Sequence, residues 1–323
     1  MTYSRLMRHL VCALLLVSFG SIAQTSYPEK PIKILQGFAP GGNADTIARL
    51  VSAELTKNLR QSIYVEAQTG AGGTLAAASV ARANPDGYTL LLATGGHAVA
   101  GALFNKLPYK TVDDFEAISS ITYFPFLLVT LSDSPYKSLS DLLKAAKDNP
   151  NSISYGTAGV GSTHHLAGEL LAKMAKVQLM HVPYRGDAAS LTALLSGEVP
   201  FIIAPPTAVN TQIKSGKLKI LAVTGSQRWS YQPNIPTVAE QGVLGYDVSS
   251  WAALLAPAKT PEPIIKKLNE EMQKVLQVQS VKDRLAEMGG EVRGSSPIQL
   301  KAMISLETKR WAELITSAKI PKQ

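Results

Sequence analysis

The sequence contains a single cysteine, Cys12, and it lies within the first 23 residues. Those residues combine a basic start, an apolar stretch over 10–19 and the small-residue end Ser21-Ile22-Ala23, which is the pattern of a secretory signal peptide. We interpret residues 1–23 as a signal peptide, with a buried N-terminal helix as the alternative. The exported chain would then have no cysteine, which excludes disulfides, a thiol nucleophile and a cysteine-based metal site. Export without disulfides is compatible with a bacterial periplasm.

Long apolar runs and clusters of basic residues are also absent beyond residue 23. No apolar run there reaches the ~20 residues that span a membrane, so we expect a soluble protein. The formal net charge is +8, and it becomes +6 without the signal peptide, which holds two arginines and no acid. Because the lysines and arginines are scattered, we expect no nucleic-acid partner, since such a surface needs a clustered basic stripe.

Motifs of catalysis and of metal binding are scarce. The chain has no G-x-S-x-G elbow, and its five histidines form no ligand pattern. The neighbours His164 and His165 would point about 100° apart on a helix, whereas a zinc pair needs a spacing of three or four. We therefore predict no metal, no cofactor and no enzymatic activity. A secreted hydrolase that uses Ser162 with His164 or His165 is the alternative.

Stretches typical of strands alternate with stretches typical of helices. The predicted strands cover 32–35, 63–66, 88–93, 153–156, 178–182, 199–204, 218–223 and 251–257. The predicted helices cover 47–59, 75–83, 163–175, 187–196, 261–278 and 297–317, and a further helix, capped by Ser138 or Ser140, runs through Lys147. This alternation predicts α/β structure with parallel sheets covered by helices, and its extent exceeds a single doubly wound sheet.

Two extended apolar segments, 126–131 and 250–256, bracket the second α/β unit. If both cross between the units, they form a two-strand hinge. We predict domain 1 at 24–126 plus 252–323 and domain 2 at 127–251. Ligands of open α/β sheets bind at the carboxyl ends of the strands, so the expected site is the cleft between the domains, which hinge closure can bury.

The first candidate binding loop follows the first predicted strand. Gly41 and Gly42 let a ligand approach the backbone closely, and Asn43 or Asp45 can cap the helix that follows. An open helix N-terminus binds anions through its N–H groups; an ordinary capped turn is the alternative. The candidate residues of this loop are Phe38, Ala39, Pro40, Gly41, Gly42, Asn43 and Asp45.

The second candidate loop joins the strand at 153–156 to the helix at 163–175. Its backbone forms a nest, and two hydroxyls stand at the helix start, so that a carboxylate can accept several hydrogen bonds there. The candidate residues of this loop are Thr157, Ala158, Gly159, Gly161, Ser162, Thr163 and His164.

Further candidate residues lie just after the neighbouring predicted strands. Gly72 and Gly73 belong to a glycine-rich segment whose spacing differs from a dinucleotide fingerprint, and which we interpret as a cleft wall or a tight turn. Thr94 and His97 follow a buried strand, with His97 as a polar wall residue rather than a catalyst. Arg185 can pair with a carboxylate through two hydrogen bonds, or it is a surface arginine balanced by Asp187.

Together these segments resemble the Bug, or tripartite tricarboxylate transporter receptor, family of extracytoplasmic solute-binding proteins. The matching segments run in family order along nearly all of the chain beyond residue 23. They are Tyr27-Pro28-x-x-Pro31-Ile32, Phe38-x-Pro40-Gly41-Gly42-x-x-Asp45, Gly70-Ala71-Gly72-Gly73, Ala83-x-Pro85-Asp86-Gly87-Tyr88-Thr89-Leu90, Tyr155-Gly156-Thr157-Ala158-Gly159-x-Gly161-Ser162-x-His164-x-Leu166-Ala167-Gly168-Glu169, Val182-Pro183-Tyr184-x-Gly186, Ile235-Pro236-Thr237-x-x-Glu240 and Ala256-Pro257-x-x-Thr260-Pro261.

The resemblance implies a type II periplasmic-binding fold that closes over its ligand and delivers it to a membrane permease of the tripartite type. It implies that loop 38–45 holds ligand carboxylates partly through waters, and that loop 156–164 holds them through backbone and hydroxyl donors. Family ligands include tricarboxylates, dicarboxylates, acidic amino acids and aromatic acids. We expect the protein to be a monomer. An alternative function is that of a ligand sensor for a signalling receptor.

One departure from the family bears on the ligand. The family has acids near the positions of Pro200 and Ala204, where this chain has none. An acid there would accept an ammonium group, because a buried cation without a partner is costly. Its absence favours a di- or tricarboxylate, or an aromatic dicarboxylate such as terephthalate, over an amino acid.

Overall fold

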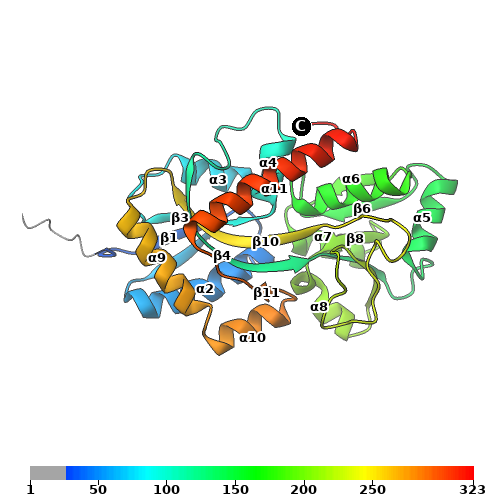
Figure 1. Ribbon diagram of the computed structural model, residues 1–323. Coiled ribbons are helices and arrows are strands. Elements are labelled where there is room, and N and C mark those ends of the chain that lie inside the picture. Colours follow the sequence, from blue (N-terminus) through cyan, green and yellow to red (C-terminus); the bar gives the residue numbers. More distant parts are fainter. Residues whose placement is uncertain (1–26) are drawn as a thin grey trace, which may run out of the picture.

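Two mixed β-sheets, each flanked by helices, lie side by side and form two domains (Figure 1). The computed structural model describes residues 27–323, so the predicted signal peptide lies outside the described residues. One sheet has six strands in the order β11-β4-β10-β3-β1-β2, and the other has five in the order β7-β6-β8-β5-β9. The predicted two-unit α/β organisation is therefore confirmed.

The six-stranded sheet is parallel on one side and antiparallel on the other. Its strands are β1 (Ile32–Gln36), β2 (Ile63–Ala67), β3 (Thr89–Thr94), β4 (Phe115–Pro125), β10 (Ser249–Pro257) and β11 (Glu291–Val292). β1 pairs in parallel with β2 and β3, as predicted, whereas β10 runs antiparallel to β3 and β4. The predicted parallel pairing therefore holds for β1, β2 and β3 but not for β4 and β10, because the chain leaves the domain along β4 and returns along β10.

Helices cover this sheet, and the C-terminal helix lies across it. They are α2 (Asn43–Leu59), α3 (Thr74–Ala81), α4 (Gly96–Leu103), α9 (Glu262–Val275), α10 (Gln279–Glu287) and α11 (Pro297–Ser317), with a short 3₁₀ turn η1 (Ala71–Gly73). The predicted apolar face of α2 is buried at Ile47, Val51 and Leu55. Burial of each such side chain contributes about 1.5–3 kcal/mol.

The five-stranded sheet repeats the mixed pattern. Its strands are β5 (Leu127–Leu131), β6 (Ser154–Thr157), β7 (Met180–Pro183), β8 (Phe201–Ala204) and β9 (Leu218–Val223). β6 is parallel to β7 and β8, and β5 is antiparallel to β8 and β9. The helices are α5 (Leu139–Asp148), α6 (Thr163–Ala175), α7 (Asp187–Leu195) and α8 (Pro206–Lys214). Sequence patterns alone missed α4, α8 and α10.

The chain passes between the domains at two neighbouring places. β4 leads into β5 through Phe126, and β10 begins after the segment 224–248. Thr224 joins the two passages: its hydroxyl accepts from the Phe126 N–H at 2.8 Å and donates to the Val248 carbonyl at 2.7 Å. The hinge is therefore a hydrogen-bonded unit, and the domain limits at 126/127 and 251/252 stay a prediction.

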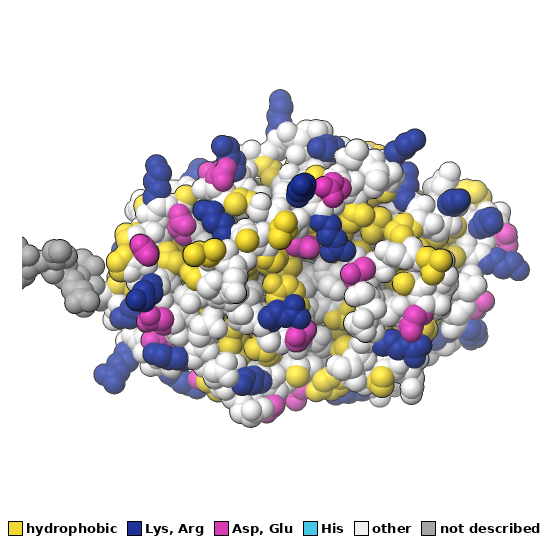
Figure 2. All heavy atoms as spheres, viewed as in Figure 1, with side chains coloured by type: hydrophobic (Ala, Val, Ile, Leu, Met, Phe, Trp, Pro, Cys, Tyr) yellow, Lys and Arg dark blue, Asp and Glu magenta, His cyan; other side chains and the backbone are white. Residues whose placement is uncertain are grey.

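Charged side chains are spread over the face seen in Figure 2, with acidic residues among the lysines and arginines and no cluster of one sign. Among residues 27–323 no helix combines the length and the hydropathy that crossing a bilayer requires.

Candidate functional site

Loops from both domains enclose a cavity of about 320 Å³ at the carboxyl ends of their strands. One wall follows β1 and β2, and the opposite wall follows β6 and β7. The lining residues are Gly37, Phe38, Thr69, Gly70, Ala71, Gly72, Ala158, Gly159, Tyr184, Arg185 and Gly186. The cavity has the size of a small-molecule site and lies where ligands of open α/β sheets bind.

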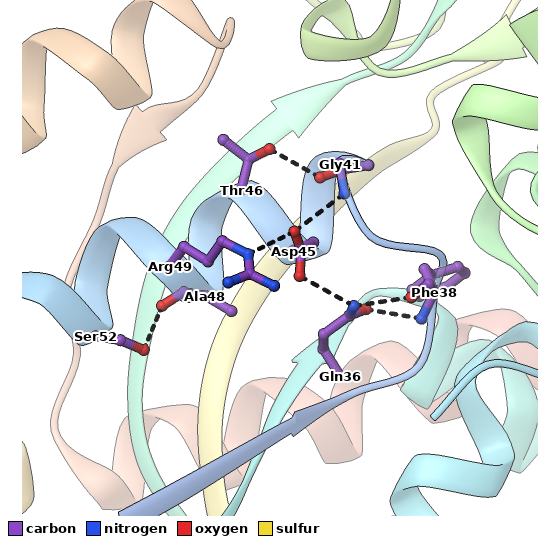
Figure 3. A network of polar contacts seen from close by, with 9 residues as sticks. Gln36, Phe38, Gly41, Asp45, Thr46, Ala48, Arg49 and Ser52 are labelled. Carbon is purple, nitrogen blue, oxygen red and sulfur yellow. Dashed lines mark hydrogen bonds and ion pairs between the residues drawn. The ribbon is translucent and has the colours of Figure 1, made fainter. Parts of the chain in front are cut away.

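The loop between β1 and α2 is held in shape by the amide of Gln36 (Figure 3). The Phe38 N–H donates to Gln36 Oε1 at 2.7 Å, and Gln36 Nε2 donates to the Phe38 carbonyl at 2.8 Å. The same nitrogen lies 3.4 Å from Asp45 Oδ1, and Asp45 Oδ2 accepts from the Gly41 N–H at 3.0 Å. These bonds fix the backbone of the loop before any ligand arrives.

Asp45 therefore supports the loop from behind. Its carboxylate also accepts from Arg49 Nε at 2.8 Å. Burial acts to raise the pKa of the Asp45 carboxyl, but the hydrogen bonds from Arg49, Gly41 and Gln36 outweigh it and keep that pKa below its usual value. The prediction that Asn43 or Asp45 caps α2 is wrong. The N-cap residue is Gly42, and no side chain forms a capping hydrogen bond there.

The second predicted loop, between β6 and α6, is also built from internal hydrogen bonds. Ser162 is the N-cap of α6: its Oγ accepts from the His165 N–H at 3.3 Å and donates to the Gly159 carbonyl at 2.6 Å. The Thr157 hydroxyl accepts from the Gly159 N–H and lies 2.6 Å from His181 Nε2. Both hydroxyls are buried, and a ligand contact through either one stays a prediction.

The same bonds bear on the hydrolase alternative. The Ser162 proton points to a carbonyl, and the His165 ring accepts from the Gly161 N–H through Nδ1 at 3.4 Å. His164 lies beside Asp187 instead. Activation of a serine needs its hydroxyl within hydrogen-bond reach of a basic nitrogen, and no such pair is present at Ser162 in the described chain.

Glycines bring the two domains into contact beside the cavity. Gly72 has φ +63°, and a Cβ there would lie 2.6 Å from the Val160 carbonyl oxygen of the other domain. Gly161 has φ +80°, and its Cβ would lie 2.7 Å from the Phe104 ring. Any larger residue would hold the loops apart, so these glycines permit the close approach of the two domains.

A smaller cavity of about 20 Å³ lies deeper between the domains and contains a buried acid. Asp187, the first residue of α7, lies with Oδ2 3.4 Å from the Asn43 N–H at the start of α2. Its Oδ1 lies 3.2 Å from His164 Nε2. The Asn43 side chain in turn accepts a hydrogen bond from the Thr207 hydroxyl at 2.8 Å. Asn43 thus connects the domains through both its backbone and its side chain.

The predicted site residues divide into three groups. Phe38, Gly72, Ala158, Gly159 and Arg185 line the larger cavity. Phe38, Asn43, Thr94, Thr163 and His164 line the smaller one. The remaining candidates line neither of the two: Ala39, Pro40, Gly41, Gly42, Asp45, Gly73, His97, Thr157, Gly161 and Ser162.

His97 is part of the packing of domain 1. Its Nε2 lies 2.8 Å from the Thr111 carbonyl, and its ring packs edge-on against Phe115. Burial lowers the pKa of His97 to about 4, so the ring is neutral at neutral pH. It lines a third small cavity beneath Gly72 and Gly73.

The sequence analysis missed Asp187 as a cleft residue. It appeared only as a possible balance for Arg185, but Asp187 faces His164, and no acid of residues 27–323 forms an ion pair with Arg185. The signal that could have found it is its position just after the β7 end, where Val182-Pro183-Tyr184 leads into a glycine and a helix start.

A family profile described as "Tripartite tricarboxylate transporter family receptor" matches residues 47–320. The chain belongs to this family. The family is one of solute-binding receptors, which agrees with the expectation of a binding protein.

Solved structures of similar proteins agree with the fold. The periplasmic binding protein BugD is 34% identical, with a TM-score of 0.88 over 92% of this chain and 100% of that chain. A Rhodopseudomonas palustris protein, MatC, solved with bound malate, is 35% identical, with a TM-score of 0.85 over 90% and 100%. Rpa4515 of R. palustris, solved with adipate, is 33% identical, with a TM-score of 0.87 over 91% and 99%. The predicted type II periplasmic-binding fold is confirmed.

Proposed function

We propose that this chain is a periplasmic solute-binding protein that captures a small carboxylate in the cleft between its domains. The observation that carries the proposal is the 320 Å³ cavity, bounded by backbone-rich loops of both domains and by the Arg185 guanidinium. Backbone N–H groups and an arginine without an acidic partner suit a carboxylate. The carboxylate ligands of MatC and Rpa4515 support the same class.

Closure and delivery complete the proposal. The domains, at 24–126 plus 252–323 and at 127–251, would close about the Phe126 and Thr224 hinge and bury the ligand. The closed form, a monomer, would then deliver it to the membrane permease of a tripartite transporter. The family assignment supports this partner.

The test is calorimetric titration of the chain without residues 1–23. The panel contains malate, adipate, citrate and terephthalate, with a neutral sugar as the comparison. We expect at least one carboxylate to bind with a dissociation constant of about 1 μM or lower, which corresponds to about 8 kcal/mol. A sugar that binds while every carboxylate fails would refute the proposal.

Substitution of Arg185 locates the site. Arg185→Ala should weaken carboxylate binding by about 1.5–3 kcal/mol, the usual contribution of a hydrogen bond to a charged group. Arg185→Lys should recover only part of it, because a lysine lacks the two-pronged donor geometry. Arg228→Ala is the matched control, since Arg228 pairs with Glu240 outside the cavity and should not change affinity.

A further inference from the structure

The deep end of the cleft contains a carboxylate that the residues around it satisfy only in part. The Asp187 side chain is 7% exposed, and its one hydrogen bond to residues 27–323, from the Asn43 N–H, is long at 3.4 Å. An ionised carboxylate has about four acceptor positions, and burial without partners is unfavourable. Asp187 therefore has room for further donors.

His164 beside it is also unsatisfied. Its side chain is 9% exposed, and neither ring nitrogen has a hydrogen-bond partner among residues 27–323. Nε2 lies 3.2 Å from Asp187 Oδ1, which is the distance of an ion pair, but the directions do not fit a hydrogen bond. Buried polar groups normally have partners, so both side chains indicate a missing polar group.

The cavity between these groups suits one small cation. Its volume of about 20 Å³ accommodates one water-sized group. Phe38, Phe124 and Phe126 line it together with His164 and Asp187. Aromatic faces attract cations, and a carboxylate does so more strongly, whereas a second anion would face repulsion from Asp187.

We propose that Asp187, together with His164, receives a basic nitrogen of the ligand. The ligand is then a carboxylate that also carries an amine, with its acid toward Arg185 and its amine toward Asp187. This inference rests on the proposed function and specifies its ligand class. It also revises the expectation drawn from Pro200 and Ala204: the acid missing there is replaced by one at the start of α7, which contacts the same cleft.

The experiment compares matched probes on three proteins. The pairs are adipate with 6-aminohexanoate, in which an aminomethyl group replaces one carboxylate, and succinate with aspartate, which is succinate with an added amine. The proteins are the unaltered chain, Asp187→Asn, which removes the charge but keeps the shape, and Asp113→Asn as a control at an exposed acid of domain 1. Asp187→Ser replaces the first variant if that one does not fold.

We expect the amine probe of at least one pair to bind the unaltered chain at least tenfold more tightly than the diacid without an amine in the same pair. Asp187→Asn should reverse that order, with the amine probe at least tenfold weaker and the diacid stronger. Asp113→Asn should leave both affinities unchanged. If the diacids bind more tightly to the unaltered chain and Asp187→Asn changes nothing, the inference fails while the proposed function stands. If no probe binds any form, the inference fails, and the wider carboxylate panel then decides the proposed function.

Discussion

Replacement of Thr224 by valine tests whether the hinge depends on one hydroxyl. Thr224 is fully buried, and its Oγ1 satisfies the Phe126 N–H on one passage and the Val248 carbonyl on the other. The Thr224 backbone pairs with the same two residues, with its N–H donating to Phe126 and its carbonyl accepting from Val248. Valine keeps the volume and these backbone bonds but removes both side-chain bonds.

The expected loss follows from the two backbone groups left without partners. A buried donor or acceptor that loses its partner costs about 1–3 kcal/mol. Two such groups suggest a loss of about 3 kcal/mol in the free energy of unfolding, or about 6 °C in Tm for a protein of this size. Thr224→Ser keeps the hydroxyl and loses one methyl group, which costs about 1 kcal/mol.

Urea unfolding followed by tryptophan fluorescence measures both variants, since Trp229, Trp251 and Trp311 are all buried. Thr224→Val should be about 2 kcal/mol less stable than Thr224→Ser. Thr130→Val gives a comparison within domain 2, because the buried Thr130 hydroxyl makes one bond, to the Pro200 carbonyl at 2.7 Å. Equal stability of the valine and serine variants at Thr224 would refute the assignment of the hinge to this hydroxyl.

Two further predictions concern the cleft loops and pH. Ser162→Ala should destabilise the fold by about 1–2 kcal/mol in chemical unfolding, because it removes the α6 N-cap and leaves the Gly159 carbonyl without its donor; unchanged stability would contradict this role. Burial lowers the pKa values of His97 and His165 to about 4, and burial with the neighbouring His165 lowers that of His181 to about 3. Since these folded values lie below the unfolded value of about 6.5, stability should be complete above that pH and fall as the pH decreases toward 4, by roughly 3 kcal/mol per histidine. A stability profile that stays flat over this range would show that the rings are protonated without cost.

Local sequence patterns were sufficient to predict those helices and strands in which the apolar residues recur at one regular spacing. The predicted limits of α6, β9 and α11 agree with the structure residue for residue. The helix α8 was missed because it begins with Pro205-Pro206, although proline is favourable in the first turn of a helix. β4 was missed because its serines break the apolar pattern.

The role of these serines in β4 is visible only in the folded chain, where their hydroxyls form hydrogen bonds to distant residues. The Ser120 hydroxyl donates to the Arg293 carbonyl, and the Ser119 hydroxyl accepts from the Ser295 N–H, across more than 170 residues. No window of the sequence contains both partners, so the strand has no local signal. The same reason hid Asp187, whose contact with Asn43 joins residues 144 apart. Sequence predicted the cleft through glycines and helix starts, but not which side chains meet inside it.

Backbone groups and charged side chains have different roles in the cleft. The loops after β1 and β6 fix their shape through bonds to Gln36, Asp45 and Ser162. We therefore expect their ligand contacts to come largely from the backbone. Backbone donors bind any carboxylate and distinguish poorly between them. Discrimination must then come from charged side chains that reach the cleft, and Arg185 and Asp187 lie two residues apart at the start of α7. A short segment with opposite charges at two cavities that share Phe38 can therefore determine which ligand binds without altering the fold.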